Sequence, residues 1–357
     1  MSLELQLSTA HARTPKATVS TITTNGTFIV TCDVNGNAWS VNTRNSGLPV
    51  LLDMECAISV CCNSDDEDKT FYLLNSLGIV SLYYPHDKSR ESEEKHTVEE
   101  VQIADPILSI SAESTRGVFV SSVGTVHTFL SKDGTIEELV IDDCIISTQS
   151  GANFTLLLGQ NGSVWVCDGT PLKNRSYNSS QHQLICFAGQ TEPQRFVKVI
   201  EESNIASIAC GNGHAVFLLD DGAVYSCGNG MLGELGQGGN ALEVILPKKI
   251  NSLPPVLSIC CTTHGSFYIT EDDLLFYSGQ AGSVRSYDAH KIEGIYEPVL
   301  YVSSGAACTS DVWIIGEDDS IWKLNRGLVA SKEKFGWQKS QGPICGKYQI
   351  SGKSARK

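Results

Sequence analysis

Apolar and polar residues follow one another along the chain in a pattern that recurs. In its clearest copy, residues 204–228, an apolar run enters a stretch of small residues, and a second apolar run ends at Asp221-Gly222. A third apolar run follows from Val224. Asp-Gly or Asn-Gly between apolar runs is typical of a β-hairpin, because both central residues can take positive φ. Each copy is therefore predicted to contain a β-hairpin.

Seven copies appear when the chain is aligned on the turn residue. The turn positions are Gly36, Gly78, Gly124, Gly162, Gly222, Asp273 and Asp319. Upstream of the turns, apolar residues recur in pairs at i and i+3: Val19 and Ile22, Ala57 and Val60, Ile107 and Ile110, Ile205 and Ile208, Val256 and Ile259, and Val299 and Val302. The fourth copy departs from this spacing, because Ile145 is followed by Thr148. The pattern predicts repeated units of about 47 residues.

One column of the alignment holds only small residues. Its members are Thr24, Cys62, Ala112, Ser150, Cys210, Cys261 and Ser304. A strand position that is small in every copy is predicted to be crowded, as at the narrow inner end of a wedge-shaped blade. This packing accounts for three of the 13 cysteines, and the chain has no Cys-x-x-Cys pair. We therefore expect reduced thiols in a core and no metal site.

The repeat indicates how the whole chain folds. A single unit would expose two apolar sheet faces, so the units are expected to stack and cover one another in a closed ring. The predicted fold class is all-β: a seven-bladed β-propeller of four-stranded antiparallel blades over residues 17–330. Residues 1–16 then form an N-terminal extension, and residues 331–357 form a basic C-terminal tail. WD and Kelch propellers are alternatives, although the chain has no Trp-Asp dipeptide and paired glycines only at Gly238-Gly239.

The charge balance narrows the class of partner. The 357 residues include 40 acidic and 26 basic side chains, for a formal net charge of −14. A diffuse acidic surface repels phosphate groups, so we do not expect DNA binding. No apolar run reaches the ~18 residues of a spanning helix, and the first residues lack the basic and apolar blocks of a secretory signal. We therefore expect a cytoplasmic or nuclear protein that is not secreted and binds no membrane.

The fifth unit carries the most complete motif of the chain. It reads Ile208-Ala-Cys-Gly-Asn-Gly-His214, then Asp221-Gly-Ala-Val-Tyr-Ser-Cys-Gly228, and then Gly233-Glu-Leu-Gly236-Gln-Gly238. This unit resembles the repeat of the regulator of chromosome condensation family; other units keep only the Gly-x-Val-aromatic part. The resemblance implies a seven-bladed propeller. The structural repeat positions are Cys210, Gly211, His214, Gly222, Gly228, Gly233 and Gly236, beside the turn glycines Gly36, Gly78, Gly124 and Gly162.

The resemblance also implies a function. Founding members of the family exchange nucleotide on the small GTPase Ran, with one propeller face and an inserted β-wedge against the switch regions, and they bind chromatin through a basic N-terminal tail. Residues 1–16 here carry little positive charge, whereas residues 331–357 have seven Lys or Arg against one Glu. We expect a non-catalytic protein-interaction propeller whose partner is a small GTPase, acting as a guanine nucleotide exchange factor or regulator. The alternative is an adaptor or scaffold subunit of a cytosolic or nuclear complex without a GTPase, for example one that modifies tRNA or a translation factor.

Two polar insertions interrupt the repeat, at residues 86–100 and 171–185. Both are rich in turn formers and are predicted to be loops. Loops that project from a rigid ring are common recognition sites. The candidate binding residues in these two loops are Arg90, Glu93, Glu94, Arg175 and Tyr177. Neither loop has the alternating apolar pattern of a β-wedge.

The remaining polar residues do not suggest catalysis. His214 stands at the structural histidine position of the family repeat, where a hydrogen bond across the blade is expected. Paired acids such as Asp220-Asp221 lie at predicted hairpin tips, where turn geometry accounts for them. The chain has no Walker loop, Gly-x-Ser-x-Gly elbow or His-x-x-x-His spacing. We expect no catalytic residue, no cofactor and a monomeric ring within a complex; an enzyme with its site in the central channel is the third hypothesis.

Overall fold

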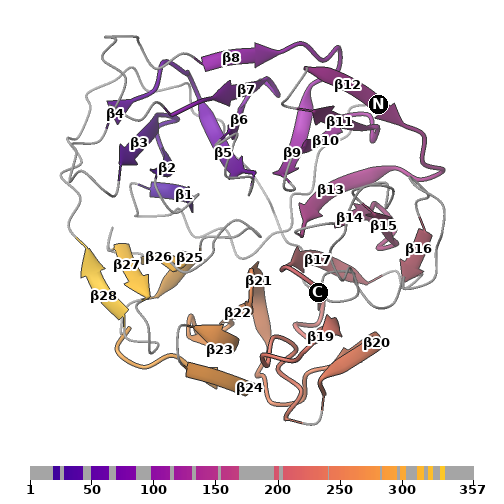
Figure 1. The fold of residues 1–357 in the computed structure, drawn as a ribbon, viewed down its shortest axis with the longest axis vertical. Coiled ribbons are helices and arrows are strands. Elements are labelled where there is room, and N and C mark those ends of the chain that lie inside the picture. Colours follow the sequence, from indigo (N-terminus) through magenta and orange to yellow (C-terminus); the bar gives the residue numbers. More distant parts are fainter. Residues whose placement is uncertain are drawn as a thin grey trace, which may run out of the picture.

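The computed structural model describes residues 19–24, 28–42, 50–63, 70–85, 98–112, 116–130, 134–151, 154–168, 197–200, 204–239, 241–281, 284–295, 298–302, 312–316, 321–324 and 330–333. Within these residues the regular structure is entirely β-strand. Figure 1 shows seven sheets around a common centre, with the indigo first sheet beside the yellow last one. No helix in the described part of the chain is long and apolar enough to cross a membrane.

The first four blades follow one another along the chain. Blade one contains β1 (Val19–Thr24), β2 (Phe28–Asp33), β3 (Ala38–Asn42) and β4 (Val50–Leu51). Blade two contains β5 (Ala57–Cys62), β6 (Phe71–Asn75), β7 (Val80–Tyr83) and β8 (Val98–Val101). Blade three contains β9 (Ile107–Ala112), β10 (Arg116–Ser121), β11 (Val126–Leu130) and β12 (Thr135–Leu139). Blade four contains β13 (Ile145–Ser150), β14 (Phe154–Gly159), β15 (Val164–Asp168) and β16 (Val197–Ile200).

The last three blades continue the ring. Blade five contains β17 (Ile205–Cys210), β18 (His214–Leu219), β19 (Val224–Asn229) and β20 (Glu243–Lys249). Blade six contains β21 (Val256–Thr262), β22 (Gly265–Thr270), β23 (Leu275–Ala281) and β24 (Val284–Lys291). Blade seven contains β25 (Val299–Val302), β26 (Val312–Gly316), β27 (Ile321–Leu324) and β28 (Ala330–Glu333). The last strand therefore takes in three residues of the segment assigned above to the C-terminal tail.

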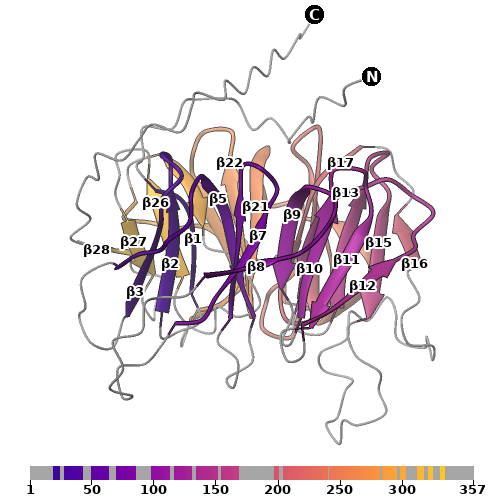
Figure 2. The same ribbon diagram turned by 90° about the horizontal axis from the view of Figure 1, so that it is seen from above.

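Each sheet is made of four consecutive antiparallel strands. The first strand of each blade lines the centre of the ring, and the fourth lies at the outside (Figure 1). The side view in Figure 2 shows the blades standing beside one another around the axis. These observations confirm the predicted all-β, seven-bladed propeller with four-stranded blades.

Apolar packing between neighbouring blades holds the ring together. The buried apolar residues of the described chain fall into seven clusters, and each cluster joins one pair of neighbouring blades. The cluster between the last and first blades contains Ile22, Ile29, Val41, Trp313, Ile315 and Ile321. In the described residues, blade seven and blade one share no strand, and the contact between them is side-chain packing. The expectation that each unit covers its neighbours is thus met at every junction.

The turns between the second and third strands lie at one end of the ring, together with the connections between blades; we call this end the turn face. The turn glycines have φ between 76° and 86° at Gly36, Gly78, Gly124, Gly162 and Gly222, and Asp273 has φ 59° in the sixth blade. The residues that precede these positions do not take positive φ. Each of these turns thus has one left-handed residue, and the glycine amide donates to the carbonyl three residues before it, as Gly36 does to Asp33 (3.1 Å).

A repeated pair of backbone hydrogen bonds links the blades at the turn face; we call it the turn ladder. The turn glycine's carbonyl accepts from the first strand of the next blade, in the pairs Ala57 to Gly36 (2.8 Å), Ile107 to Gly78 (2.8 Å), Ile145 to Gly124 (3.3 Å) and Val256 to Gly222 (3.0 Å). The residue two before the turn glycine also donates to the residue that precedes the first strand of its own blade, as Ser76 does to Cys56. A Cβ at Gly78 would lie 2.6 Å from the Pro106 Cβ, so this close approach requires glycine.

The column of small residues lies where the first strands crowd together. Thr24, Cys62, Ala112, Ser150, Cys210 and Cys261 are all buried; Ser304 lies outside the described residues. Several of them contact the preceding blade: the Cys62 thiol donates to the Thr24 carbonyl (3.4 Å), and the Cys210 thiol to the Gln149 carbonyl (3.4 Å). The prediction of a crowded inner position is confirmed. Eight described cysteines carry free thiols, but Cys56 is disulfide-bonded, so the expectation of reduced thiols is wrong there.

Candidate functional site

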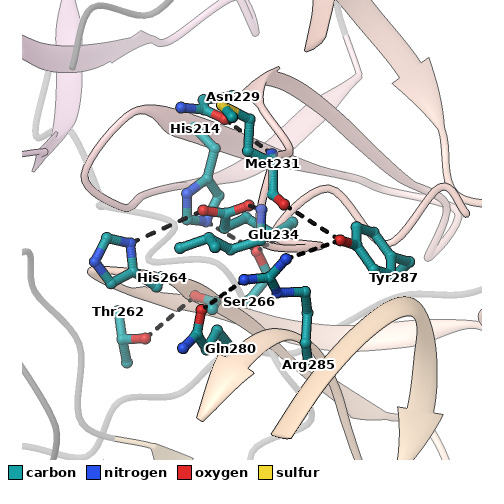
Figure 3. Close-up of polar contacts among 12 residues, drawn as sticks. His214, Asn229, Met231, Glu234, Thr262, His264, Ser266, Gln280, Arg285 and Tyr287 are labelled. Carbon is teal, nitrogen blue, oxygen red and sulfur yellow. Dashed lines mark hydrogen bonds and ion pairs between the residues drawn. The ribbon is translucent and has the colours of Figure 1, made fainter. Parts of the chain in front are cut away.

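The densest polar cluster of the described chain lies between blades five and six (Figure 3). It is built around residues 230–242, which join β19 to β20 and which we call the junction loop; residue 240 lies outside the described residues. The loop crosses to blade six, where the Gly238 amide donates to the Tyr287 carbonyl (2.9 Å) and the Ser266 hydroxyl donates to the Glu234 carbonyl (2.7 Å). The loop is therefore a bridge between two blades.

Gly233 allows the junction loop to approach blade six. Its φ is 94°, and a Cβ there would lie 2.2 Å from the Ser286 carbonyl oxygen. Both the dihedral angle and the space exclude a side chain. Gly228 and Gly236 also take positive φ, in β19 and in the loop. The predicted repeat positions thus lie just before the bridge, at Gly228, and within it, at Gly233 and Gly236.

His214 begins β18 and is 1% exposed. Its Nε2 atom lies 3.0 Å from the Ser266 Oγ. Because Ser266 gives its only hydroxyl proton to the Glu234 carbonyl, Nε2 must carry the proton and donate it to Ser266. The expected hydrogen bond across the blade therefore goes to the neighbouring blade. Gly211 leaves room for the ring, since a Cβ there would lie 2.1 Å from the His214 Cε1.

The environment of His214 keeps its imidazole neutral. Burial, followed by the charge of His264, lowers the pKa of His214 to about 3, although a backbone hydrogen bond with Gly265 opposes the shift. A sealed, neutral histidine exchanges no protons with solvent near neutral pH. His214 is consequently a structural donor that sets the position of blade six.

Glu234 lies at the centre of the cluster and is 4% exposed. Its carboxylate accepts from the Leu232 amide (2.8 Å), and its Oε1 lies 3.9 Å from the Nδ1 of His264 on blade six. Burial raises the pKa of Glu234, while its own amide, that of Leu232 and the charge of Arg285 act in the opposite direction. The carboxylate therefore anchors the loop and faces a half-exposed histidine.

The outer edge of the cluster is polar and accessible. Arg285 donates to the Tyr287 hydroxyl (3.1 Å) and to the Gln280 Oε1 (3.4 Å), and its guanidinium lies 5.9 Å from the centre of the Tyr287 ring. The Tyr287 hydroxyl donates to the Met231 carbonyl of the junction loop (3.4 Å). Figure 3 shows these side chains lying beside Glu234 and His264. Arginine, tyrosine and methionine are enriched at protein interfaces, so this edge can bind another protein.

Exposed apolar side chains adjoin this polar edge. Met231 is 54% exposed and Leu242 is 49% exposed, and the two residues belong to one backbone-bonded turn because Gly230 donates to the Leu242 carbonyl (2.9 Å). We call Met231, Leu242, Arg285 and Tyr287 the rim patch. Ile245 and Leu246 on the outer strand extend the apolar surface, at 57% and 72% exposed.

The candidate binding residues of the two insertions, Arg90, Glu93, Glu94, Arg175 and Tyr177, lie outside the described residues. The described residues hold no group of three or more His, Cys, Asp and Glu side chains arranged as a metal site. Glu234 belongs to the family motif, but no role was predicted for it. Ser266, His264 and the rim patch were not predicted either. No local signal marks Ser266, which stands in an apolar strand.

A second feature that was not predicted is a column of hydroxyl groups in the first strands, five of which border the central channel. The third residue of every first strand carries a hydroxyl: Thr21, Ser59, Ser109, Ser147, Ser207, Ser258 and Tyr301. The channel contains a cavity of about 270 Å³ bordered by the first strands of all seven blades. The hydroxyl column stands one position before the second member of each i, i+3 pair, so the alignment contained the signal.

Comparison with known proteins places this site within a family repeat. Models of the regulator of chromosome condensation (RCC1) repeat match residues 205–234 and 221–269, which include His214, Glu234 and Ser266. A relative, the regulator of chromosome condensation of Xenopus laevis, is 24% identical over 274 residues, which cover 65% of this chain and 61% of the relative. This chain thus spans less than two thirds of that relative's length.

Solved structures share the fold. Human WBSCR16 aligns with a TM-score of 0.64 and 16% identity, over 81% of this chain and 85% of that one. Prp20p of Saccharomyces cerevisiae, studied for its binding to Gsp1p and histones, aligns with a TM-score of 0.61 and 15% identity, over 80% of each chain. The RCC1 repeat models therefore match blades five and six, and the seven four-stranded blades have the same fold as these similar proteins.

Proposed function

We propose that this chain is a protein-interaction propeller that binds a protein partner through the rim patch, and that the first candidate partner is a small GTPase. The observation that carries the proposal is the rim patch itself: two exposed apolar side chains, an arginine and a tyrosine, held at the edge of a rigid junction. Exposed apolar groups beside Arg and Tyr have the composition of an interface centre.

The rigidity of the junction supports this proposal. Hydrogen bonds of the junction loop to blade six fix the backbone at Glu234 and Gly238, which flank the loop's buried centre. A pre-organised surface loses little conformational entropy when a partner binds. The similar protein Prp20p, described by its binding to Gsp1p and histones, supports a protein as the partner. Guanine nucleotide exchange is then the activity to test, and a cytoplasmic or nuclear location stays a prediction.

Nucleotide release tests the proposal directly. Purified chain is added to each member of a panel of small GTPases loaded with fluorescent GDP, and the release rate is followed. We expect one GTPase to release nucleotide faster or slower, and the R285A/Y287A double variant to lose most of that effect, because interface arginines and tyrosines carry much of the binding energy. The control is Ile136→Thr, which changes a 37% exposed apolar side chain on β12, away from the rim.

The outcomes separate the alternatives. An effect that R285A/Y287A and I136T leave equally intact would remove the rim patch from the proposal. If no GTPase responds, while a defined protein co-purifies with the wild type and not with R285A/Y287A, the chain is an adaptor in a complex without a GTPase. If neither activity depends on the rim patch, the proposal is wrong.

A further inference from the structure

The turn face, at the opposite end of the blades from the junction loop, carries a second set of exposed apolar side chains. They belong to blades one to three and to the connection that follows: Val34 (46% exposed), Ile58 (49%), Leu77 (65%), Val123 (62%) and Val140 (93%). We call these five residues the apolar arc. Single exposed apolar residues are common on protein surfaces, but a series on one face marks a contact surface.

The turn ladder places members of the arc beside one another. The turn that holds Val34 accepts a hydrogen bond at Gly36 from Ala57, which precedes Ile58. Ser76, which precedes Leu77, donates to Cys56, two residues before Ile58. The same two kinds of bond recur at the next blade. The Ile107 amide donates to the Gly78 carbonyl, and the amide of Ser122, which precedes Val123, donates to the Pro106 carbonyl. Backbone bonds therefore connect the segments that carry four of these five residues, across three blades.

Turn geometry does not explain these apolar side chains. Leu77 and Val123 stand immediately before the turn glycine, and the same position holds Asn35 in blade one, Asn161 in blade four and Asp221 in blade five. Those three blades form the same turn with a polar residue. The apolar residues of blades two and three consequently serve something other than the turn.

The charge of the turn face shows what kind of partner fits. Its described turns and blade connections contain the acids Asp53, Glu55, Asp105, Asp142, Asp143, Asp220, Asp221, Glu271, Asp272, Asp273 and Glu293, and they contain no Lys, Arg or His. Asp53 and Glu55 are exposed and precede Ile58 closely, and Asp142 is exposed beside Val140. The arc is thus an apolar path within a negative field.

This field excludes several occupants. Nucleic acids and anionic membranes would bring like charge to the face. A second copy docked by the same face would place acids opposite acids, which is unfavourable at an interface. A protein segment with apolar side chains flanked by lysine or arginine complements both features.

We propose that the turn face is a second docking surface, whose occupant is a protein segment that presents apolar side chains flanked by Lys or Arg. This surface adds to the protein-binding function proposed above and uses none of the rim patch. Two surfaces at opposite ends of the blades would let the ring hold two partners at once.

The probe is a short labelled peptide that alternates leucine and lysine, titrated with the full chain and followed by fluorescence anisotropy. Peptides of lysine with serine, and of glutamate with leucine, test the two parts of the chemistry. L77N/V123N removes apolar groups and installs the residue that blades one and four already use at that position. D53N/E55Q removes two charges beside Ile58, and E243Q/D288N removes two exposed charges from the outer strands of blades five and six as the matched control.

We expect the leucine-lysine peptide to bind the wild type and E243Q/D288N equally, and to bind L77N/V123N and D53N/E55Q about tenfold more weakly. Equal affinity for all four proteins, equal binding of the lysine-serine or glutamate-leucine peptide, or no binding of the leucine-lysine peptide would each overturn the proposal. R285A/Y287A is expected to bind the peptide as the wild type does. If only R285A/Y287A lost affinity for the peptide, the peptide would bind at the rim patch and the proposal would be wrong. The result of the GTPase test would not be affected.

Discussion

The junction between blades five and six differs from the junctions that precede it around the ring. All the described junctions from blade one to blade four, and that between blades five and six, carry the turn ladder, which is made of backbone groups. Only the five-six junction, among the described ones, adds a bridging loop with a buried histidine and glutamate. Backbone hydrogen bonds tolerate most changes of side chain, whereas the His214–Ser266–Glu234 chain tolerates few. This difference explains how the family motif can be complete in one blade while the other blades keep the fold.

The largest effect should come from breaking the bridge itself. Gly233→Ala forces a side chain into a left-handed backbone position and against the Ser286 carbonyl oxygen. We expect a loss of about 3 kcal/mol or more in the free energy of unfolding. Urea denaturation measures it. Gly239→Ala is the matched control, because a Cβ there meets nothing within 4 Å, and it should change stability by less than about 0.5 kcal/mol.

Removing the shared hydroxyl should come next. Ser266→Ala leaves the buried His214 N–H without its acceptor, and we expect a cost of about 2 kcal/mol. Ser150→Ala at the junction of blades three and four leaves Ser111 bonded to Thr148 (2.9 Å), so it should cost about 1 kcal/mol or less. Equal losses in the two variants, measured by urea denaturation, would show that the junctions do not differ in this respect.

Acid should weaken the five-six junction selectively. The pKa of His214 is about 3 in the folded chain and 6.5 as a free side chain, so the unfolded state binds the proton more readily. The stabilisation is complete above pH 6.5 and is lost as the pH falls toward 3, by about 2 kcal/mol at pH 5. Glu234 opposes this trend, since its raised pKa favours the folded state in acid. His214→Gln should flatten the stability profile between pH 6.5 and 5, and an unchanged slope would contradict the assignment.

The smallest effect belongs to the turn face. Leu77→Asn replaces a 65% exposed side chain with the residue that stands before the turn glycine in blades one and four. We expect its free energy of unfolding to change by less than about 0.5 kcal/mol. A larger loss in thermal or urea unfolding would mean that Leu77 packs within the ring and is not available to a partner.

The fold could be predicted from the sequence because its determinants are local and repeated. Every i, i+3 apolar pair and every turn glycine indicates the same repeated unit. The unit in the fourth copy could therefore be recognised although Thr148 departs from the pattern. The geometry of the turn was not predicted, because Asp-Gly suits several hairpin types that differ in the residue before glycine. The backbone angles show one left-handed residue.

The candidate site was only partly predictable. His214 and Gly233 were marked by the family motif, but their partners Ser266 and Ser286 lie in the next blade, about fifty residues away. Such pairs depend on how two neighbouring blades pack. A short segment of sequence carries no information about that packing. The rim patch and the apolar arc were missed for a related reason: apolar residues at strand ends look like core until the exposed fraction of each side chain is known.

The seam between blade seven and blade one has a consequence for how rings of this kind arise. At this seam, Trp313, Ile315 and their neighbours pack against Ile22 and Ile29. In the described chain, no backbone hydrogen bonds join the two sheets into one. If one unit were gained or lost, only an apolar interface between blades would have to form anew. The strand order within each sheet would stay the same. A seam of this kind leaves the number of blades open to change by duplication of a unit.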